Sequence, residues 1–485
     1  MKKLLCKTVC LLVVLSAVFA AVSCSGNGKN PGVSGSGQES VPVTASLPDI
    51  RFDGEKISFL VRGQGNEWDC IDVFQPDTTD RVSDAILNRN MKVEEQYGVE
   101  IEQTLISVDL LTEEIRKLAE SGDLSYDVYV NSQYGLYTAA IEGNLLDMNS
   151  LPYNDFTQNW WDTELNGNLT LAGHRFFAVS SMNLMSYYAT WVVTYNMGVF
   201  EDLGYDVNEP YKLVRDGAWT IDRYTEYQKD FTRDINDDGK MTDADQWGTA
   251  GQSDHILGML YGVGFSVLQK DSDDLPQLQI PSNSIYEAMS KVMALCIKGN
   301  AFDSHDQSVN TQYSTDGEYG RRMFADNRAM FFHETLKAVS TLRDMNGEFG
   351  VVPVPKYNEN QKNYISMVHY WATSMNAVPS WGRSTEKVSA ILEALAYYSE
   401  KTVVPEFLNS AVYGKYLRDD ASYEMMNEYI RANRFIDFGI VSQIGGIIGV
   451  VKSGIYDGTL NYHRIIDSVK TGVAAELESL ADQLR

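Results

Sequence analysis

The sharpest local pattern in the sequence is a twelve-residue run of oxygen-bearing side chains that could bind calcium. In an EF-hand loop the ligands come from positions 1, 3, 5, 7 and 12, and glycine stands at position 6. Gly239 occupies position 6 here, and Asp245 stands at position 12, where an EF-hand has the longer glutamate. We expect a weak structural calcium site, and a solvated turn is the alternative. The predicted ligands are Asp234, Asn236, Asp238, the main-chain carbonyl of Lys240, and Asp245.

Residue patterns typical of catalytic sites are missing from the sequence. There is no P-loop, nucleophile elbow or HExxH string, and no Cys/His cluster with zinc spacing. Adjacent acids such as Glu94-Glu95 do not by themselves place two carboxyl groups across a glycosidase site. We therefore expect no catalytic residue and no required cofactor, although glycosidases also lack short signatures. The scattered histidines are His174, His255, His305, His333, His369 and His463.

The first residues form an export signal. A positively charged start is followed by an apolar stretch over 8–22, and a polar, Gly- and Ser-rich segment begins at once after Cys24. The stretch is too short for a spanning helix. Ala21-Val22-Ser23-Cys24 resembles the bacterial lipobox, which implies removal of residues 1–23, lipidation of Cys24 and a flexible tether over 24–49. We expect an extracytoplasmic protein anchored to the cell membrane by lipid; an ordinary secretory leader is the alternative.

Composition and charge exclude several classes of protein. The 485 residues are 44% apolar and carry a net charge of −26, so a globular chain is expected. A polyanion repels phosphate backbones, so nucleic acid is a poor partner. Outside the leader and Cys24, only Cys70 and Cys296 remain. Two buried thiols are the simplest interpretation, and a disulfide stays open.

Beyond the leader and tether, the periodicity predicts strands that alternate with helices. This order is typical of a parallel sheet with covered faces. A second block with an initial strand follows near residue 190, and no repeat is visible. In the first block, the predicted strands cover 56–60, 99–105 and 126–130, and the predicted helices cover 82–97, 111–118 and a segment ended by Gly143. In the second block, strands are predicted over 191–196, 328–332 and 349–355, a helix over 221–231 with Thr220 as its N-cap, and two amphipathic helices over 415–439.

In open α/β sheets, ligands bind beyond the carboxyl ends of the strands. The first predicted strand is followed by Gln64 and Trp68, and the third is followed by Asn131, Gln133 and Tyr134. These five side chains are therefore candidate ligand-binding residues.

Several segments in order resemble the large bacterial extracellular solute-binding proteins of the maltose-binding type. The resemblance covers essentially residues 50–480. It is carried by the lipobox and tether, Tyr195-Asn196, Trp219-Thr220, Asp234 to Gly239 ahead of Gln246-Trp247-Gly248, Phe324 to Met330, and Phe349 to Pro355.

The resemblance implies a two-lobed, type II periplasmic-binding-protein-like α/β fold. Each lobe would be a mainly parallel sheet with flanking helices, and an interlobe cleft would hold the ligand. The implied N-terminal lobe is 50–187 plus 346–378, and the implied C-terminal lobe is 188–345 plus 379–485. The implied partners are a carbohydrate and the transmembrane subunits of an ABC permease, with the chain itself a monomer.

A sugar-binding site needs aromatic faces for the C–H side of the rings and planar polar groups for the hydroxyls. The chain has 8 Trp, 28 Tyr and 18 Phe, although for any single ring a place in the core is the alternative. Besides Asn131, Gln133 and Tyr134, the resemblance implies contacts from Tyr187, Tyr188, Gln252, Asp254, His255, Phe332, His333, Glu334, Tyr370, Trp371, Phe438 and Gln443, with Phe332 or His333 in place of the usual stacking tryptophan.

Together these features predict a solute-binding lipoprotein of an ABC importer that captures a sugar or oligosaccharide by lobe closure. Two other classes share the leader and the aromatic richness: a surface-anchored glycan-active enzyme and an adhesion lipoprotein. The enzyme would turn over a glycan, whereas a carrier would show only stoichiometric binding.

Overall fold

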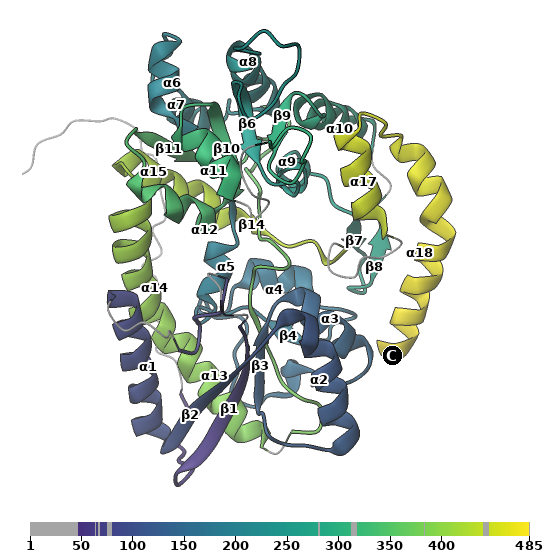
Figure 1. The fold of residues 1–485 in the computed structure, drawn as a ribbon. Coiled ribbons are helices and arrows are strands. Elements are labelled where there is room, and N and C mark those ends of the chain that lie inside the picture. The colour runs from purple at the N-terminus through teal and green to yellow at the C-terminus, as the bar shows by residue number, and fades with distance from the viewer. Residues whose placement is uncertain are drawn as a thin grey trace, which may run out of the picture. The chain divides into compact units, whose positions relative to one another are not determined.

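Two five-stranded sheets organise the chain (Figure 1). The computed structural model describes residues 47–63, 65, 68–74, 80–279, 282–311, 318–382, 384–439 and 446–484. Gln64, Gln443, Cys24 and residues 1–46, on which part of the sequence predictions rest, lie outside the described residues.

The first sheet has the strand order β2-β1-β3-β13-β4. Strands β2, β1 and β3 are parallel, and β13 runs antiparallel to both of its neighbours. Four of the five strands therefore share one direction, with β13 inserted from a distant part of the sequence. The strands are β1 (Glu55–Arg62), β2 (Val99–Ile106), β3 (Val128–Asn131), β4 (Phe177–Ala178) and β13 (Met375–Ala377).

A capping side chain and a left-handed glycine set the two ends of α1, the first helix on this sheet. The Asp80 side chain accepts a hydrogen bond from Ser83 N (2.9 Å) and caps α1. The helix ends at Gly98, whose left-handed φ of 64° lets its N–H reach Glu94 O. The sheet and the helices on it are called the first lobe below. Its helices are α1 (Arg81–Tyr97), α2 (Val108–Ser121), α3 (Gln133–Ile141), α4 (Thr163–Leu169), α13 (Thr385–Tyr398) and the short η1 (Met148–Ser150).

The second sheet repeats this design in the order β11-β5-β10-β6-β9. Strand β5 is antiparallel to β11 and β10, and β10, β6 and β9 are parallel. The predicted pair of mainly parallel sheets with flanking helices is thus confirmed. The strands are β5 (Trp191–Asn196), β6 (Trp247–Gly251), β9 (Ala301–Asp303), β10 (Ala329–Thr335) and β11 (Phe349–Val352).

The second lobe comprises this sheet, its helices and a hairpin. Thr220 caps α8 as predicted, and the ring of Tyr224 on α8 stacks on Phe331 of β10 with centroids 4.2 Å apart. The hairpin strands are β7 (Leu268–Lys270) and β8 (Pro276–Leu278). The helices are α6 (Met197–Asp202), α7 (Glu209–Arg215), α8 (Ile221–Phe231), α9 (His255–Gly262), α10 (Asn283–Cys296), α11 (Glu318–Ala325), α12 (Leu336–Val339), η2 (Ser340–Asp344), α15 (Asp420–Glu424), η5 (Met425–Ile430), α17 (Ile447–Tyr456) and α18 (Tyr462–Leu484).

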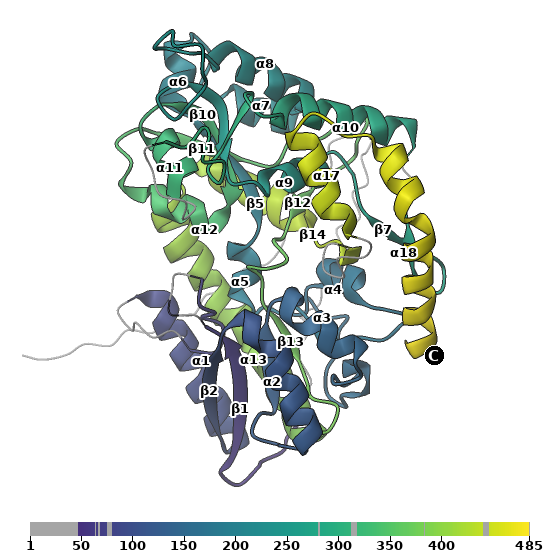
Figure 2. The ribbon, with the colours of Figure 1, turned by 45° about the vertical axis from the view of Figure 1, so that its right-hand side comes forward.

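Several segments pass between the lobes. One is α5 (Leu184–Tyr188), which leads from β4 to β5. A second contains β12 (Ser366–Met367), which pairs with β14 (Arg434–Phe435) after the short η6 (Arg431–Asn433). A third is a helical run that continues α13 toward the second lobe (Figure 2). The run consists of η3 (Ser399–Val403), α14 (Val404–Glu406) and η4 (Phe407–Tyr416).

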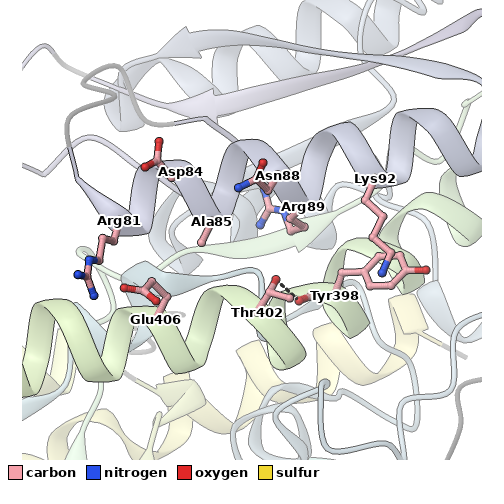
Figure 3. A pocket seen from close by; sticks show the side chains of 9 residues that line it. All are labelled: Arg81, Asp84, Ala85, Asn88, Arg89, Lys92, Tyr398, Thr402 and Glu406. Carbon is pink, nitrogen blue, oxygen red and sulfur yellow. Dashed lines mark hydrogen bonds between the residues drawn. The ribbon is translucent and has the colours of Figure 1, made fainter. Parts of the chain in front are cut away.

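Helix α1 lies along this helical run, with a groove between them (Figure 3). Lys92 Nζ lies 4.1 Å from the centroid of the Tyr398 ring. Beneath the groove, the buried Arg89 guanidinium donates to Ser399 Oγ (3.0 Å) and to Asp72 O (2.8 Å), and burial lowers the pKa of Arg89 to about 10. These contacts fix the helical run to the first lobe.

The structure places two segments differently from the implied lobe boundaries. Within 346–378, β11 pairs with the second sheet, and only β13 joins the first. Helix α13, expected in the C-terminal lobe, packs beside α1. The second amphipathic helix expected before Gly439 is replaced by β14, because Arg434 and Phe435 pair with Ser366 and Met367. Cys70 and Cys296 are free and buried.

None of the helices among the described residues is both long enough and apolar enough to cross a membrane.

Glu393 on α13 ties a loop to the first lobe, which gives a test of the fold. Its two carboxylate oxygens accept the indole N–H groups of Trp160 (2.7 Å) and Trp161 (2.8 Å). Glu393→Gln would place an NH₂ group against one indole N–H. We expect the free energy of unfolding, measured in urea, to fall by about 2 kcal/mol. The matched control is Glu386→Gln, at an exposed position of the same helix, where a change of at most about 0.5 kcal/mol is expected. Equal effects of the two substitutions would contradict this role of Glu393.

Candidate functional site

The carboxyl end of β3 presents buried polar groups without partners. Asn131 Oδ1 accepts the N–H of Ser132 (2.8 Å), but its Nδ2 has no hydrogen-bond partner. The carboxamide of Gln133 has none at either atom. Both side chains are fully buried. Because an unpaired buried polar group costs stability, such groups are candidates to bind a ligand or water.

On the second lobe, Asp254 lies just before α9 and forms the centre of a charged cluster. Its Oδ1 lies 2.6 Å from Lys452 Nζ, and its Oδ2 lies 3.1 Å from His369 Nε2. Burial alone would raise the pKa of Asp254, but the hydrogen bond and charge of His369 and the charge of Lys452 hold it below its usual range. Asp254 is therefore an ionised acceptor.

Two histidines next to this cluster are kept neutral by burial. Burial lowers the pKa of His255 to about 4, and it also lowers the pKa of His333 well below its ordinary value. Neither ring has a hydrogen-bond partner at either nitrogen. His333 lies under α9, since a Cβ added at Gly258 would fall 2.7 Å from its ring.

Glu334 on β10 adds a second carboxyl group, and its pKa is raised, whereas that of Asp254 is lowered. Burial raises the pKa of Glu334 to about 7, although its Oε1 accepts the N–H of Thr335 (2.7 Å). The negative charge of Asp254 adds to this rise in the pKa of Glu334, and a hydrogen bond with the Gln252 side chain partly offsets it.

The segment after β12 supplies stacked rings between the lobes. His369 and Tyr370 lie 4.9 Å apart at 11°, and Trp191 lies 6.0 Å from His369 at 23°. Burial, followed by the charges of Asp254 and Tyr134, raises the pKa of Tyr370. Tyr134 on α3 of the first lobe is 40% exposed. Tyr370 thus lies next to the Asp254 cluster, because its ring stacks on His369, which is bonded to Asp254.

Arg62, at the end of β1, positions this segment. Its guanidinium is buried and donates to the carbonyls of Trp371 (2.6 Å), Ala372 (2.8 Å) and Thr373 (3.0 Å). It also donates to Trp68 O (3.0 Å), and it lies 5.7 Å from the Trp371 ring. Trp68 and Trp371 are half-buried beside it.

Other residues that were predicted to bind ligand pack against aromatic rings in other parts of the fold. Phe332 packs in the second lobe against Phe324, 6.0 Å away. Tyr187 and Tyr188 pack on Phe407 of the helical run. Phe438 contacts Tyr137 of the first lobe at 5.4 Å. With His333 under α9, the structure buries both rings that were expected to substitute for a stacking tryptophan; which residues bind ligand stays a prediction.

A polar pocket of about 380 Å³ lies beside Tyr187. The guanidinium of Arg434 lies 4.2 Å from the Tyr187 ring and is paired with Asp162. Glu400 accepts a hydrogen bond from Ser181 Oγ (2.6 Å) in the same pocket. Its polar side chains are thus largely engaged with one another.

Calcium binding by the loop over 234–245 stays a prediction. Asp234 accepts hydrogen bonds from the main-chain N–H groups of Asp237 and Gly239, both at 2.8 Å, and Asp245 accepts one from Thr242 N (2.8 Å). Across the described part of the chain, no three His, Cys, Asp or Glu side chains are arranged to hold a metal ion.

Three residues of this site were missed by sequence reasoning. Arg62 carried a weak signal, because a charged residue directly follows the apolar run Phe59-Leu60-Val61. His369 stands directly before the predicted Tyr370 and Trp371. Lys452 gave no signal, since it lies 198 residues from Asp254 in the sequence.

Comparison with known structures shows a shared fold. A substrate-binding protein of an ABC transporter from Listeria monocytogenes, in complex with cycloalternan, is 12% identical, with a TM-score of 0.55 and coverage of 88% of this chain and 100% of the other. The cyclic α-maltosyl-1,6-maltose binding protein from Arthrobacter globiformis is 14% identical, with a TM-score of 0.56 and the same coverage. A solute-binding protein from Thermotoga lettingae bound with α-D-tagatose is 16% identical, with a TM-score of 0.53, over 87% and 100%. No protein-family model and no curated protein matches the sequence.

The opposed pKa shifts of His255 and Glu334 predict a pH dependence of stability. His255 has an ordinary pKa of 6.5 and a folded-state pKa of about 4, so its contribution is full above pH 6.5 and is lost as the pH falls toward 4. Glu334 has an ordinary pKa of 4.5 and a folded-state pKa of about 7, so its contribution is full below pH 4.5 and is lost as the pH rises toward 7. Between pH 4.5 and 6.5 the two slopes oppose each other.

We expect single variants to separate the two slopes in urea unfolding at pH 6.5, 5.5 and 4.5. The unfolding free energy of His255→Leu, relative to wild type, should rise by up to about 1.4 kcal/mol per pH unit of acidification. That of Glu334→Gln should fall over the same range. The control is Leu110→Gln at an exposed position without an ionisable group, whose difference from wild type should stay flat. Slopes of the same sign for His255→Leu and Glu334→Gln would contradict the assignment.

Proposed function

We propose that this chain, which has the fold of the sugar-binding components of ABC transporters, captures a carbohydrate and delivers it to a membrane permease. The observation that carries the proposal is the place of Tyr370: its ring stacks on His369 of the Asp254 cluster, and the next residue, Trp371, is bonded to Arg62 of the first lobe. Aromatic rings next to fixed planar hydrogen-bonding groups are what a polyhydroxylated solute requires.

The charges of the site suit a neutral sugar. Asp254 is paired with Lys452 and lies against His369, so it offers charge-assisted hydrogen bonds without a large net charge. The unpartnered groups of Asn131 and Gln133 would gain hydrogen bonds from sugar hydroxyls. A solute that bridges the lobes would shift the population toward a closed form, which the permease would recognise.

A thermal-shift screen with maltose, maltotetraose, cycloalternan and α-D-tagatose tests this function. A bound sugar in excess should raise the melting temperature, because ligand binding stabilises the native state by RT ln(1 + [L]/Kd). Tyr370→Ala should weaken the affinity for the stabilising sugar about tenfold by calorimetry, since a stacking face is lost. The control is Tyr413→Ala, an exposed ring on η4, which should leave affinity unchanged.

A glycan-active enzyme is the second candidate. Asp254 is held ionised, while the pKa of Glu334 is raised to about 7, and carboxyl groups whose pKa values are pushed apart are found in glycosidases. The ion pairs of Asp254 favour a binding role. Prolonged incubation of the same oligosaccharides should release no shorter product; turnover that Glu334→Gln abolishes would instead establish the enzyme.

The lipobox-like segment supports a membrane-anchored, extracytoplasmic location. We propose that Cys24 carries the lipid and that residues 25–49 tether the lobes. In a bacterial expression host, Cys24→Ser should move the protein from the membrane fraction to the soluble fraction, because the acylation site is lost. Ser25→Ala is the control and should stay with the membranes. A Cys24→Ser protein that still sediments with membranes after a carbonate wash would contradict the anchor.

A further inference from the structure

Helix α4 of the first lobe is held at both ends by cations from outside that lobe. At its start, Asp162 accepts the N–H of Leu165 (3.0 Å) and forms an ion pair with Arg434 of β14. At its end, Lys270 of the β7–β8 hairpin donates to Gly167 O (2.9 Å) and to Thr170 O. The last carbonyls of a helix lack intrahelical partners and carry partial negative charge, so an ammonium group satisfies them well.

The same hairpin also holds the turn that follows α4. Asp274 is ion-paired with Lys270 at 2.9 Å. It accepts the N–H of Ala172 through its main-chain oxygen (3.0 Å) and the N–H of Gly173 through Oδ2 (2.9 Å). The contact therefore combines charge-assisted bonds with main-chain pairing between the lobes.

Backbone strain marks both sides of this contact. Ala172 has a φ of 51° and Asp274 a φ of 60°, and side chains make this left-handed conformation unfavourable. Strained residues persist where their surroundings hold them in place. The two strained residues are hydrogen-bonded directly to each other, so the backbone strain lies at the contact between the lobes.

An apolar side chain completes the docking. Leu171, next to the strained Ala172, is 1% exposed and belongs to the hydrophobic core of the second lobe, together with Val267 and Leu268. In contrast, Leu165 and Leu169 of α4 belong to the core of the first lobe. A single short stretch, 165–171, thus has side chains in both cores.

We propose that α4 and the turn over 170–173 form an interlobe clamp, with the β7–β8 hairpin as its second half, and that this clamp must open before solute is released. The part of this proposal that concerns solute release rests on the proposed function, whereas the contact between the lobes does not depend on it. Lys270 is a positioning residue here, since it holds the lobes together and is not assigned to the sugar.

Lys270→Met tests the clamp, because methionine keeps most of the apolar stem and removes the ammonium group. In the full chain without sugar, the amides of Ala172 and Gly173 should exchange hydrogen at least about tenfold faster than in wild type. The dissociation rate of whichever sugar of the panel stabilises the protein most should rise by a similar factor, and Lys270→Arg should restore both rates in large part. The control is Lys212→Met on the exposed surface of α7, which should change neither.

The outcomes separate this proposal from the function on which it builds. Unchanged amide exchange in Lys270→Met would overturn the clamp, as would faster exchange with an unchanged sugar dissociation rate. If no sugar of the panel binds, the proposed function fails. In that case, the radius of gyration from small-angle scattering decides on the clamp: an increase in Lys270→Met, but not in Lys212→Met, supports it, and equal values overturn it.

Discussion

The site depends on one buried cation. Arg62 ends β1, an inner strand of the first sheet, and its guanidinium has no carboxylate among its hydrogen-bond partners in the described structure. Its two terminal nitrogens donate instead to four main-chain carbonyls, three of them consecutive in 371–373. Burial lowers the pKa of Arg62, but an arginine stays charged under all ordinary conditions. The chain must therefore bring these carbonyls to the end of β1, and this requirement fixes the segment that carries Tyr370.

The same requirement explains why β13 stands where it does. Directly after Thr373, Ser374 donates to the buried carboxylate of Asp72, and Asn376 Nδ2 donates to Asn183 Oδ1 (2.8 Å). Asn183 also donates to Asp72 (3.1 Å). A returning strand that is surrounded by polar partners at one end can pair in only one register. These hydrogen bonds thus fix the register of the three-residue strand β13, which the burial of apolar side chains alone would not fix.

The sequence predicted what periodicity and capping control, and it missed what depends on contacts between distant segments. Helix α8 begins after Thr220 and α1 ends at Gly98, because both signals act within one helical turn. The division of 346–378 between the sheets was not predictable in this way, since β11 and β13 are both short apolar runs. For the site, the family resemblance pointed to Asp254 and Tyr370, whereas Lys452 and Arg62, which hold these segments in place, arise from tertiary packing. Phe332 was a candidate because the resemblance implies a stacking ring after this strand, but its apolar character keeps it in the core.

Interlobe contacts outside the site have a consequence for affinity. A solute that binds only the closed form has an apparent affinity reduced by the fraction of molecules in that form. In the proposed mechanism, contacts such as the bonds of Lys270 and the burial of Leu171 would stabilise the closed form without touching solute and would so raise the apparent affinity. They would also slow release, because the same bonds would have to break before the lobes part. The strain at Ala172 and Asp274 would work in the other direction, because opening of the contact would let both residues leave the left-handed conformation. A carrier of the proposed kind, which must both retain and deliver its cargo, would need these opposing contributions to be nearly balanced, and the short turn after α4 would supply both.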